Sequence, residues 1–60
     1  MGKLHVAHRV VTRDPRDRIT SDDPHDDFPA ALEAFDALTP KPGEEITLQH
    51  GARILRRKSG

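Results

Sequence analysis

The sequence predicts a small α+β domain in which one helix packs on a three- or four-stranded antiparallel sheet, in the order β(β)αββ. Between residues 27 and 38, apolar side chains recur every three or four residues, as they do along one face of a helix. From Glu45 to Arg57, two short runs of β-forming residues flank His50 and Gly51, a pattern typical of a hairpin. A similar run from Leu4 to Thr12 supplies the first strand.

The first strand is predicted to end in a tight turn. Asp14-Pro15-Arg16-Asp17 suits a type I turn, because proline presets φ at the second position and an aspartate side chain accepts hydrogen bonds from the turn backbone. A second strand would then start at Arg18-Ile19-Thr20. Ile19 is the one apolar residue of these three, so the sequence leaves open whether they form a strand.

A polar connector is predicted to follow the turn. Residues 14–26 hold one apolar side chain, two prolines and many charges, which is typical of a mobile acidic segment. Within this segment and just beyond it, the run from Ser21 to Asp27 is expected to stay an irregular loop, because it has no apolar face to bury.

The helix and the last hairpin have recognisable ends. Asp27 suits the N-cap position, and Pro29 is tolerated in the first helical turn, where its missing amide has no intrahelical acceptor. Two prolines and a glycine between residues 40 and 43 then stop the helix. In the hairpin, Gly51 supplies the positive φ of a tight turn, and Arg53 to Lys58 form the closing strand and a basic tail.

These elements define one domain, residues 1–60, with a predicted core. A domain of 60 residues buries a modest fraction of its surface, so its stability is expected to be marginal. The apolar residues that share a face of consistent period are expected to be the most buried: Leu4, Val6, Val10, Leu32, Phe35, Leu38, Ile46, Leu48 and Ile54.

Several short motifs resemble a known bacterial family. These are Leu4-His5-Val6-Ala7-His8 near the start of the chain, and His50-Gly51, Arg53-Ile54 and Lys58-Ser59 near its end. They are similar to the small proteins grouped as domain of unknown function 2188, and the resemblance covers most of the chain in order. It implies a fold in which strands flank a single alanine-rich helix, and it implies no established chemistry.

The composition narrows the class of protein. The chain has no cysteine, so neither a disulfide nor a zinc-thiolate site is expected, and an intracellular setting is favoured. No apolar run approaches the roughly 20 residues of a membrane-spanning helix, and the N-terminal residues lack the apolar core of a signal peptide. A cytoplasmic protein without a cofactor is therefore expected.

Charge is unevenly distributed along a chain whose formal net charge is zero. Residues 1–13 hold three bases and no acid, residues 14–36 hold eight acids and two arginines, and residues 37–60 hold five bases and two glutamates. If the first and last strands lay side by side, their bases would form a stripe that attracts phosphate groups. The candidate binding residues are Arg9, Arg13, Arg53, Arg56, Arg57 and Lys58.

The sequence supports a metal site or a catalytic site less well than a binding surface. Four histidines, at positions 5, 8, 25 and 50, suggest a metal site, but His5 and His8 lie three apart on a predicted strand and therefore point to opposite faces. The aspartates between residues 22 and 27 fall in the predicted loop, where carboxylates are hydrated and ionised rather than tuned for acid or base catalysis.

The sequence therefore predicts a non-enzymatic protein-interaction module, a small accessory or regulatory protein of a bacterium, phage or mobile element; the step from size to role is an analogy. The partner is expected to be another protein or a second copy that meets an unpaired sheet edge, with Leu4 to Val11 and Arg53 to Arg57 as candidate edge strands. The alternative is a nucleic-acid-binding accessory factor that uses the basic terminal strands, although the chain has no tyrosine or tryptophan on which bases would stack.

Overall fold

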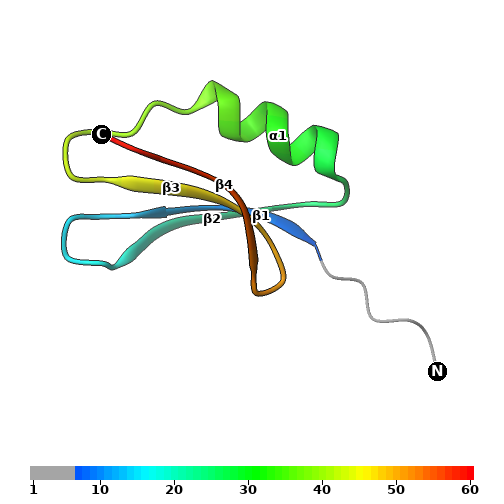
Figure 1. The fold of residues 1–60 in the computed structure, drawn as a ribbon, viewed down its shortest axis with the longest axis horizontal. Helices are drawn as coiled ribbons and strands as arrows, with labels where there is room; N and C mark the ends of the chain where they lie inside the picture. Colours follow the sequence, from blue (N-terminus) through cyan, green and yellow to red (C-terminus); the bar gives the residue numbers. More distant parts are fainter. Residues whose placement is uncertain (1–6) are drawn as a thin grey trace.

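The protein folds as one helix on a four-stranded antiparallel sheet (Figure 1). The structure, a computed structural model, describes residues 7–60. The elements along the chain are β1 (His8–Arg13), β2 (Ile19–His25), α1 (Phe28–Ala37), β3 (Glu45–His50) and β4 (Arg53–Ser59). The strands lie side by side in the order β2-β1-β3-β4, so β2 and β4 are the outer strands. The predicted α+β class is confirmed, with four strands.

Asp14 organises the turn between β1 and β2. Its backbone carbonyl accepts the amide of Asp17 at 2.9 Å, and its Oδ1 accepts the amides of Arg16 and Arg18 at 2.9 and 2.8 Å. Asp17 follows with a φ of 62°, a conformation that aspartate adopts more readily than most residues. The sequence therefore folds here as predicted, because one aspartate satisfies three backbone amides within the turn.

β2 extends further than the sequence indicated. The strand begins at Ile19 and continues to His25, with each residue from Ser21 onward paired with a residue of β1. The prediction of an irregular loop from Ser21 is wrong as far as His25. An outer strand is held by backbone hydrogen bonds to its one neighbour, so it needs no apolar face and tolerates Pro24. The predicted mobility of residues 14–26 stays a prediction.

α1 has the predicted N-terminal cap. Asp27 Oδ1 accepts the amide of Ala30 at 2.8 Å, and a proline stands in the first turn. At the other end, the amide of Leu38 donates to the carbonyl of Phe35 at 3.2 Å. The loop that follows turns at Gly43, where φ is 85° and a Cβ would meet Pro15 Cγ at 2.6 Å. This loop therefore packs tightly against the turn of the first hairpin.

The core lies between α1 and the two inner strands. It consists of Val10, Ala31, Phe35, Ile46 and Leu48, each at most 6% exposed. Two predicted core residues are not buried: Leu38 is 42% exposed because it follows the end of the helix, and Ile54 is 44% exposed because it lies on an outer strand. Leu32 is half-buried against the core, and Leu4 and Val6 lie outside the described residues.

The sheet face opposite α1 also has a buried centre. We call it the open face, and it carries Val11 of β1 and Thr47 of β3, which are direct cross-strand partners. Although α1 covers the other face (Figure 1), Val11 is 4% exposed and Thr47 is 1% exposed. Both are short side chains on inner strands, and Thr47 Oγ1 donates to Gln49 Oε1 on the same strand at 3.0 Å. Apolar burial on this face therefore needs no second layer.

The terminal strands β1 and β4 are separated. β3 pairs with β1 on one side and with β4 on the other. The last hairpin turns at Gly51, with a φ of 64°, as predicted, and it inserts β3 between the two basic strands. The prediction that adjacent terminal strands form one continuous basic stripe is therefore wrong. Within the predicted edge strand Leu4 to Val11, the residues from His8 onward belong to the inner strand β1, so they do not form a sheet edge.

Candidate interaction surface

The structure divides the six candidate residues between an inner and an outer strand. Arg9 and Arg13 belong to β1, whereas Arg53, Arg56, Arg57 and Lys58 belong to β4. Because side chains alternate along a strand, Arg9, Arg13 and Arg57 share the open face, while Arg56 and Lys58 point to the side of α1. The six residues therefore do not form one surface.

The two arginines of β1 are neutralised by carboxylates. Arg9 Nη1 lies 2.6 Å from Asp22 Oδ2 on β2, and Arg13 Nε lies 3.6 Å from Asp17 Oδ1 in the turn. Exposed ion pairs of this kind contribute at most about 1 kcal/mol to stability. A cation that already faces a carboxylate attracts a phosphate less strongly, so these pairs weaken the case for Arg9 and Arg13 as phosphate-binding residues.

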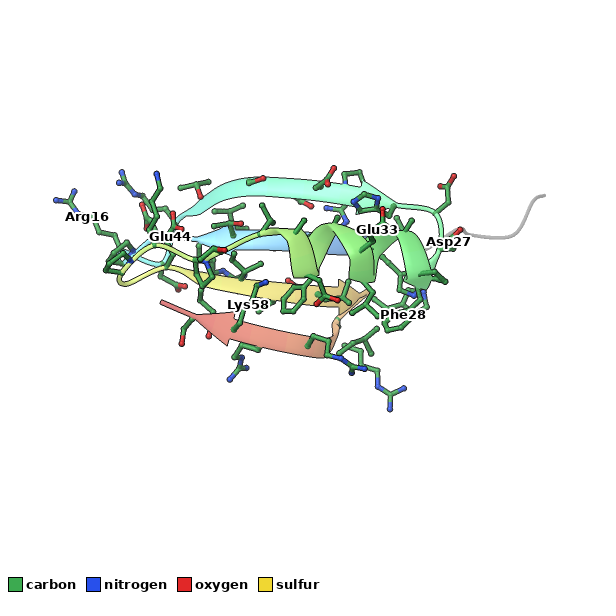
Figure 2. The ribbon with its side chains drawn as sticks, turned by 90° about the horizontal axis from the view of Figure 1, so that it is seen from above. Arg16, Asp27, Phe28, Glu33, Glu44 and Lys58 are labelled. Atoms are coloured by element: carbon green, nitrogen blue, oxygen red, sulfur yellow. The ribbon has the colours of Figure 1, made fainter. Side chains whose placement is uncertain are left out.

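The side chain of Lys58 contacts α1 and does not belong to an outer binding surface. Its Nζ donates to the carbonyl of Phe35 at 2.6 Å and lies 4.4 Å from the centre of the Phe35 ring. Figure 2 shows the Lys58 side chain between β4 and the helix. A cation here satisfies a carbonyl in the last turn of α1, where the helix dipole is negative. Lys58 is therefore a helix-capping residue contributed by a distant strand.

Among the arginines of β4, Arg53 and Arg56 lack a carboxylate partner within residues 7–60. Arg56 lies 5.9 Å from the centre of the Phe28 ring, and its Nη1 donates to the carbonyl of Leu55 at 3.0 Å. Arg57 is 60% exposed and reaches Glu45 Oε2 at 3.4 Å. We refer to Arg53, Arg56 and Arg57 together as the basic edge.

The opposite edge of the sheet is acidic. Asp22 and Asp23 lie on β2, the outer strand at the far side from β4. Asp22 binds Arg9 as described above, and Asp23 Oδ2 lies 2.7 Å from His25 Nε2 while its side chain stays 56% exposed. We refer to Asp22 and Asp23 as the acidic edge.

Cross-strand register links the two edges. In one row across the sheet, Asp23 is followed by Val10, Leu48 and Arg56. In the next row, Asp22 is followed by Val11, Thr47 and Arg57. Each row therefore begins with a carboxylate and ends with a guanidinium. Both aspartates were predicted to lie in a loop, although the turn at residues 14–17 was a signal that the chain after it would pair back along the whole first strand.

Three of the four histidines lie in one further row. His25 pairs with His8, and His8 pairs with His50. The rings of His8 and His50 stack with 4.1 Å between their centres and 5° between their planes, and His8 and Phe28 form a T-shaped pair. A bound metal lies near the plane of each imidazole, so two parallel stacked rings cannot share one ion in this geometry. Among residues 7–60, no group of three or more potential ligands is placed to hold a metal ion.

Neither a membrane-spanning helix nor a known relative is found for the described chain. Within residues 7–60, no helix has the length and apolar character needed to cross a membrane. Comparison with protein-family models, curated proteins and solved structures gives no match to this chain. The resemblance to domain of unknown function 2188 therefore stays a prediction.

Proposed function

We propose that the chain is a non-enzymatic protein-interaction module that binds an extended acidic segment of a protein partner along β4. The observation that carries this proposal is that β4 is an outer strand lined by the basic edge. In keeping with its size, we further propose a small cytoplasmic accessory or regulatory protein of a bacterium, phage or mobile element.

The position of α1 supports binding along β4. The helix backbone lies close to β1, β2 and β3 but not to β4. Figure 2 shows the helix above the middle of the sheet, with β4 beyond it. Within residues 7–60, β4 pairs with β3 alone, so its other row of backbone amides and carbonyls has no strand partner. These groups are available for main-chain hydrogen bonds with an added strand.

The charges of β4 supply selectivity. Arginines on an outer strand repel basic strands and so limit indiscriminate pairing. An acidic strand instead gains opposite-charge cross-strand pairs, each worth about 0.2–1 kcal/mol. The exposed side chain of Ile54, between Arg53 and Arg56 on β4, offers the added strand an apolar contact. A partner segment that is both extended and acidic therefore fits this edge best.

Nuclear magnetic resonance titration tests the proposal. The labelled protein is titrated with a short peptide of alternating aspartate and β-branched residues, and the largest shifts are expected at amides of β4. Polyglutamate of equal charge is the control, and it should bind more weakly because glutamate is a poor strand former. Arg56→Glu should weaken peptide binding, whereas Arg16→Glu, which reverses an exposed cation in the first turn, should leave it unchanged.

The same titration examines nucleic-acid binding, the alternative function. The observation that favours it is that Arg53 and Arg56 have no carboxylate partner within residues 7–60. A short DNA duplex would then shift β4 amides, with an affinity that falls steeply as salt rises. If the duplex binds in this way and the acidic peptide leaves the spectrum unchanged, the protein-interaction proposal is wrong.

A further inference from the structure

The two charged edges of the sheet are complementary to each other. We propose that copies of this chain associate head to tail, with the acidic edge of one copy adding to the basic edge of the next. The proposal rests on the proposed function, because it requires that β4 accept an added strand. It goes further by naming the segment that is added, which is β2 of a second copy.

The strand directions favour this arrangement. Every pair of neighbours in the sheet is antiparallel, so β2 runs in the direction of β3 and opposite to β4. When a second copy is placed beside the first without being turned over, its β2 therefore meets β4 in antiparallel fashion. The sheet would continue with the same pairing pattern, and the helices of both copies would lie on the same side.

The register makes the contact specific. If each cross-strand row continues straight into the next copy, Asp23 faces Arg56 and Asp22 faces Arg57. The first of these pairs lies on the helix side and the second on the open face, so each acid meets a base of its own face. The row between His25 and Asp23 begins with Pro24 and ends with Ile54, which adds an apolar contact.

Asp23 and Arg56 form the more informative of the two charge pairs. Within one copy, Asp22 already binds Arg9 and Arg57 already reaches Glu45, so a new contact between them competes with existing ones. The side chain of Asp23 stays 56% exposed although its Oδ2 contacts His25 Nε2 at 2.7 Å, and Arg56 has no carboxylate partner within residues 7–60. Their approach therefore forms a new ion pair at each junction between copies.

Two-fold symmetric association is disfavoured by the same charges. If β4 paired with β4 of a second copy, arginines would face arginines, and directly opposed like charges destabilise a sheet. If β2 paired with β2, aspartates of one copy would lie against aspartates of the other, which is again unfavourable. Contact between unlike edges leaves a free edge of each kind, so the assembly grows beyond two copies.

Sedimentation velocity across a range of protein concentrations tests the proposal. For the unmodified chain at low salt, the average mass is expected to rise with concentration beyond that of two chains of 6.7 kDa and to fall when salt is added. Asp23→Lys alone and Arg56→Glu alone should each stay monomeric, because each places like charges opposite each other at positions 23 and 56 of the junction. Their equimolar mixture should associate again, because every junction then joins unlike charges.

Matched controls separate edge charge from net charge. Asp36→Lys and Arg16→Glu make the same charge changes at exposed positions on α1 and in the first turn, and both should associate like the unmodified chain. Circular dichroism establishes that each variant is folded, and if Asp23→Lys unfolds, Asp23→Asn and Arg56→Gln are compared instead. These neutral variants should weaken association without restoring it on mixing.

Three outcomes would overturn the proposal. One is a chain that stays monomeric at every concentration, another is a mass that stops at two copies, and the third is a mixture of charge-reversed variants that fails to associate. If the chain stays monomeric but the acidic peptide still binds β4, the proposed function stands and self-association is wrong. If neither the peptide nor a second copy binds β4, both are wrong.

Discussion

Lys58 lies beneath the last turn of α1, where its ammonium group contacts both the carbonyl and the ring of Phe35. Lys58→Met keeps the aliphatic stem and removes the charged donor. We expect it to lower the free energy of unfolding by about 1.5–3 kcal/mol, the usual contribution of a hydrogen bond to a charged group. Urea denaturation measures this loss. Arg53→Met, at an exposed position of the same strand, is the control, and equal stability of the two variants would contradict the capping role.

Asp14 is expected to make a contribution to the stability of the fold that depends on pH. The backbone amide of Arg18, helped by its guanidinium and by the amide of Arg16, holds the pKa of the Asp14 carboxyl below its ordinary value of 3.8. Because the folded pKa is the lower one, the carboxylate stabilises the fold above the ordinary pKa. This contribution is lost as the pH falls through the folded value.

Asp14→Asn should therefore lower the melting temperature at neutral pH, and the difference from the unmodified chain should shrink as the solution is acidified below 3.8. Thermal unfolding followed by circular dichroism at several pH values measures the difference. Asp36→Asn, an exposed aspartate of α1, should show no comparable dependence on pH. A difference for Asp14→Asn that stays constant with pH would exclude the carboxylate as its source.

Among the elements, β2 is the one for which sequence and structure disagree most. Its pairing with β1 predicts that alternate amides between Ser21 and His25 exchange slowly with solvent, because these amides donate to β1, while the amides on the outer side exchange quickly. Hydrogen exchange followed by nuclear magnetic resonance at low protein concentration measures this pattern. β3, which pairs on both sides, is the internal comparison. Uniformly fast exchange from Ser21 to His25 would argue for the irregular loop that the sequence suggested.

At the scale of the whole molecule, a single small core holds the helix to the sheet. Phe35 is 6% exposed and is the largest side chain in that core. Phe35→Ala should cost about 3–5 kcal/mol, which is comparable with the total stability expected of so small a domain. Loss of a cooperative thermal transition is the expected result. Leu38→Ala, at a position 42% exposed, should keep the transition, and a Phe35→Ala variant that melts like the unmodified chain would contradict the described core.

Local interactions explain what the sequence determined by itself. The helix follows from its apolar spacing and from the Asp27 cap, and the two turns follow from Asp14 and Gly51. Each of these signals acts between residues a few positions apart, so it can be recognised without knowledge of the rest of the chain. The α+β class and a sheet of three or four strands were predictable for the same reason, whereas the second strand, now β2, was left open.

Tertiary structure alone decided which strands are neighbours. Pairing of β1 with β3 joins residues far apart in the sequence, and no local signal specifies that β3 rather than β4 lies beside β1. This choice moved Arg9 and Arg13 away from the basic edge, and it left Ile54 exposed on an outer strand. It also brought Asp22 and Asp23 to the opposite edge, because β2 is stabilised by backbone pairing to β1 and not by an apolar pattern that the sequence displays.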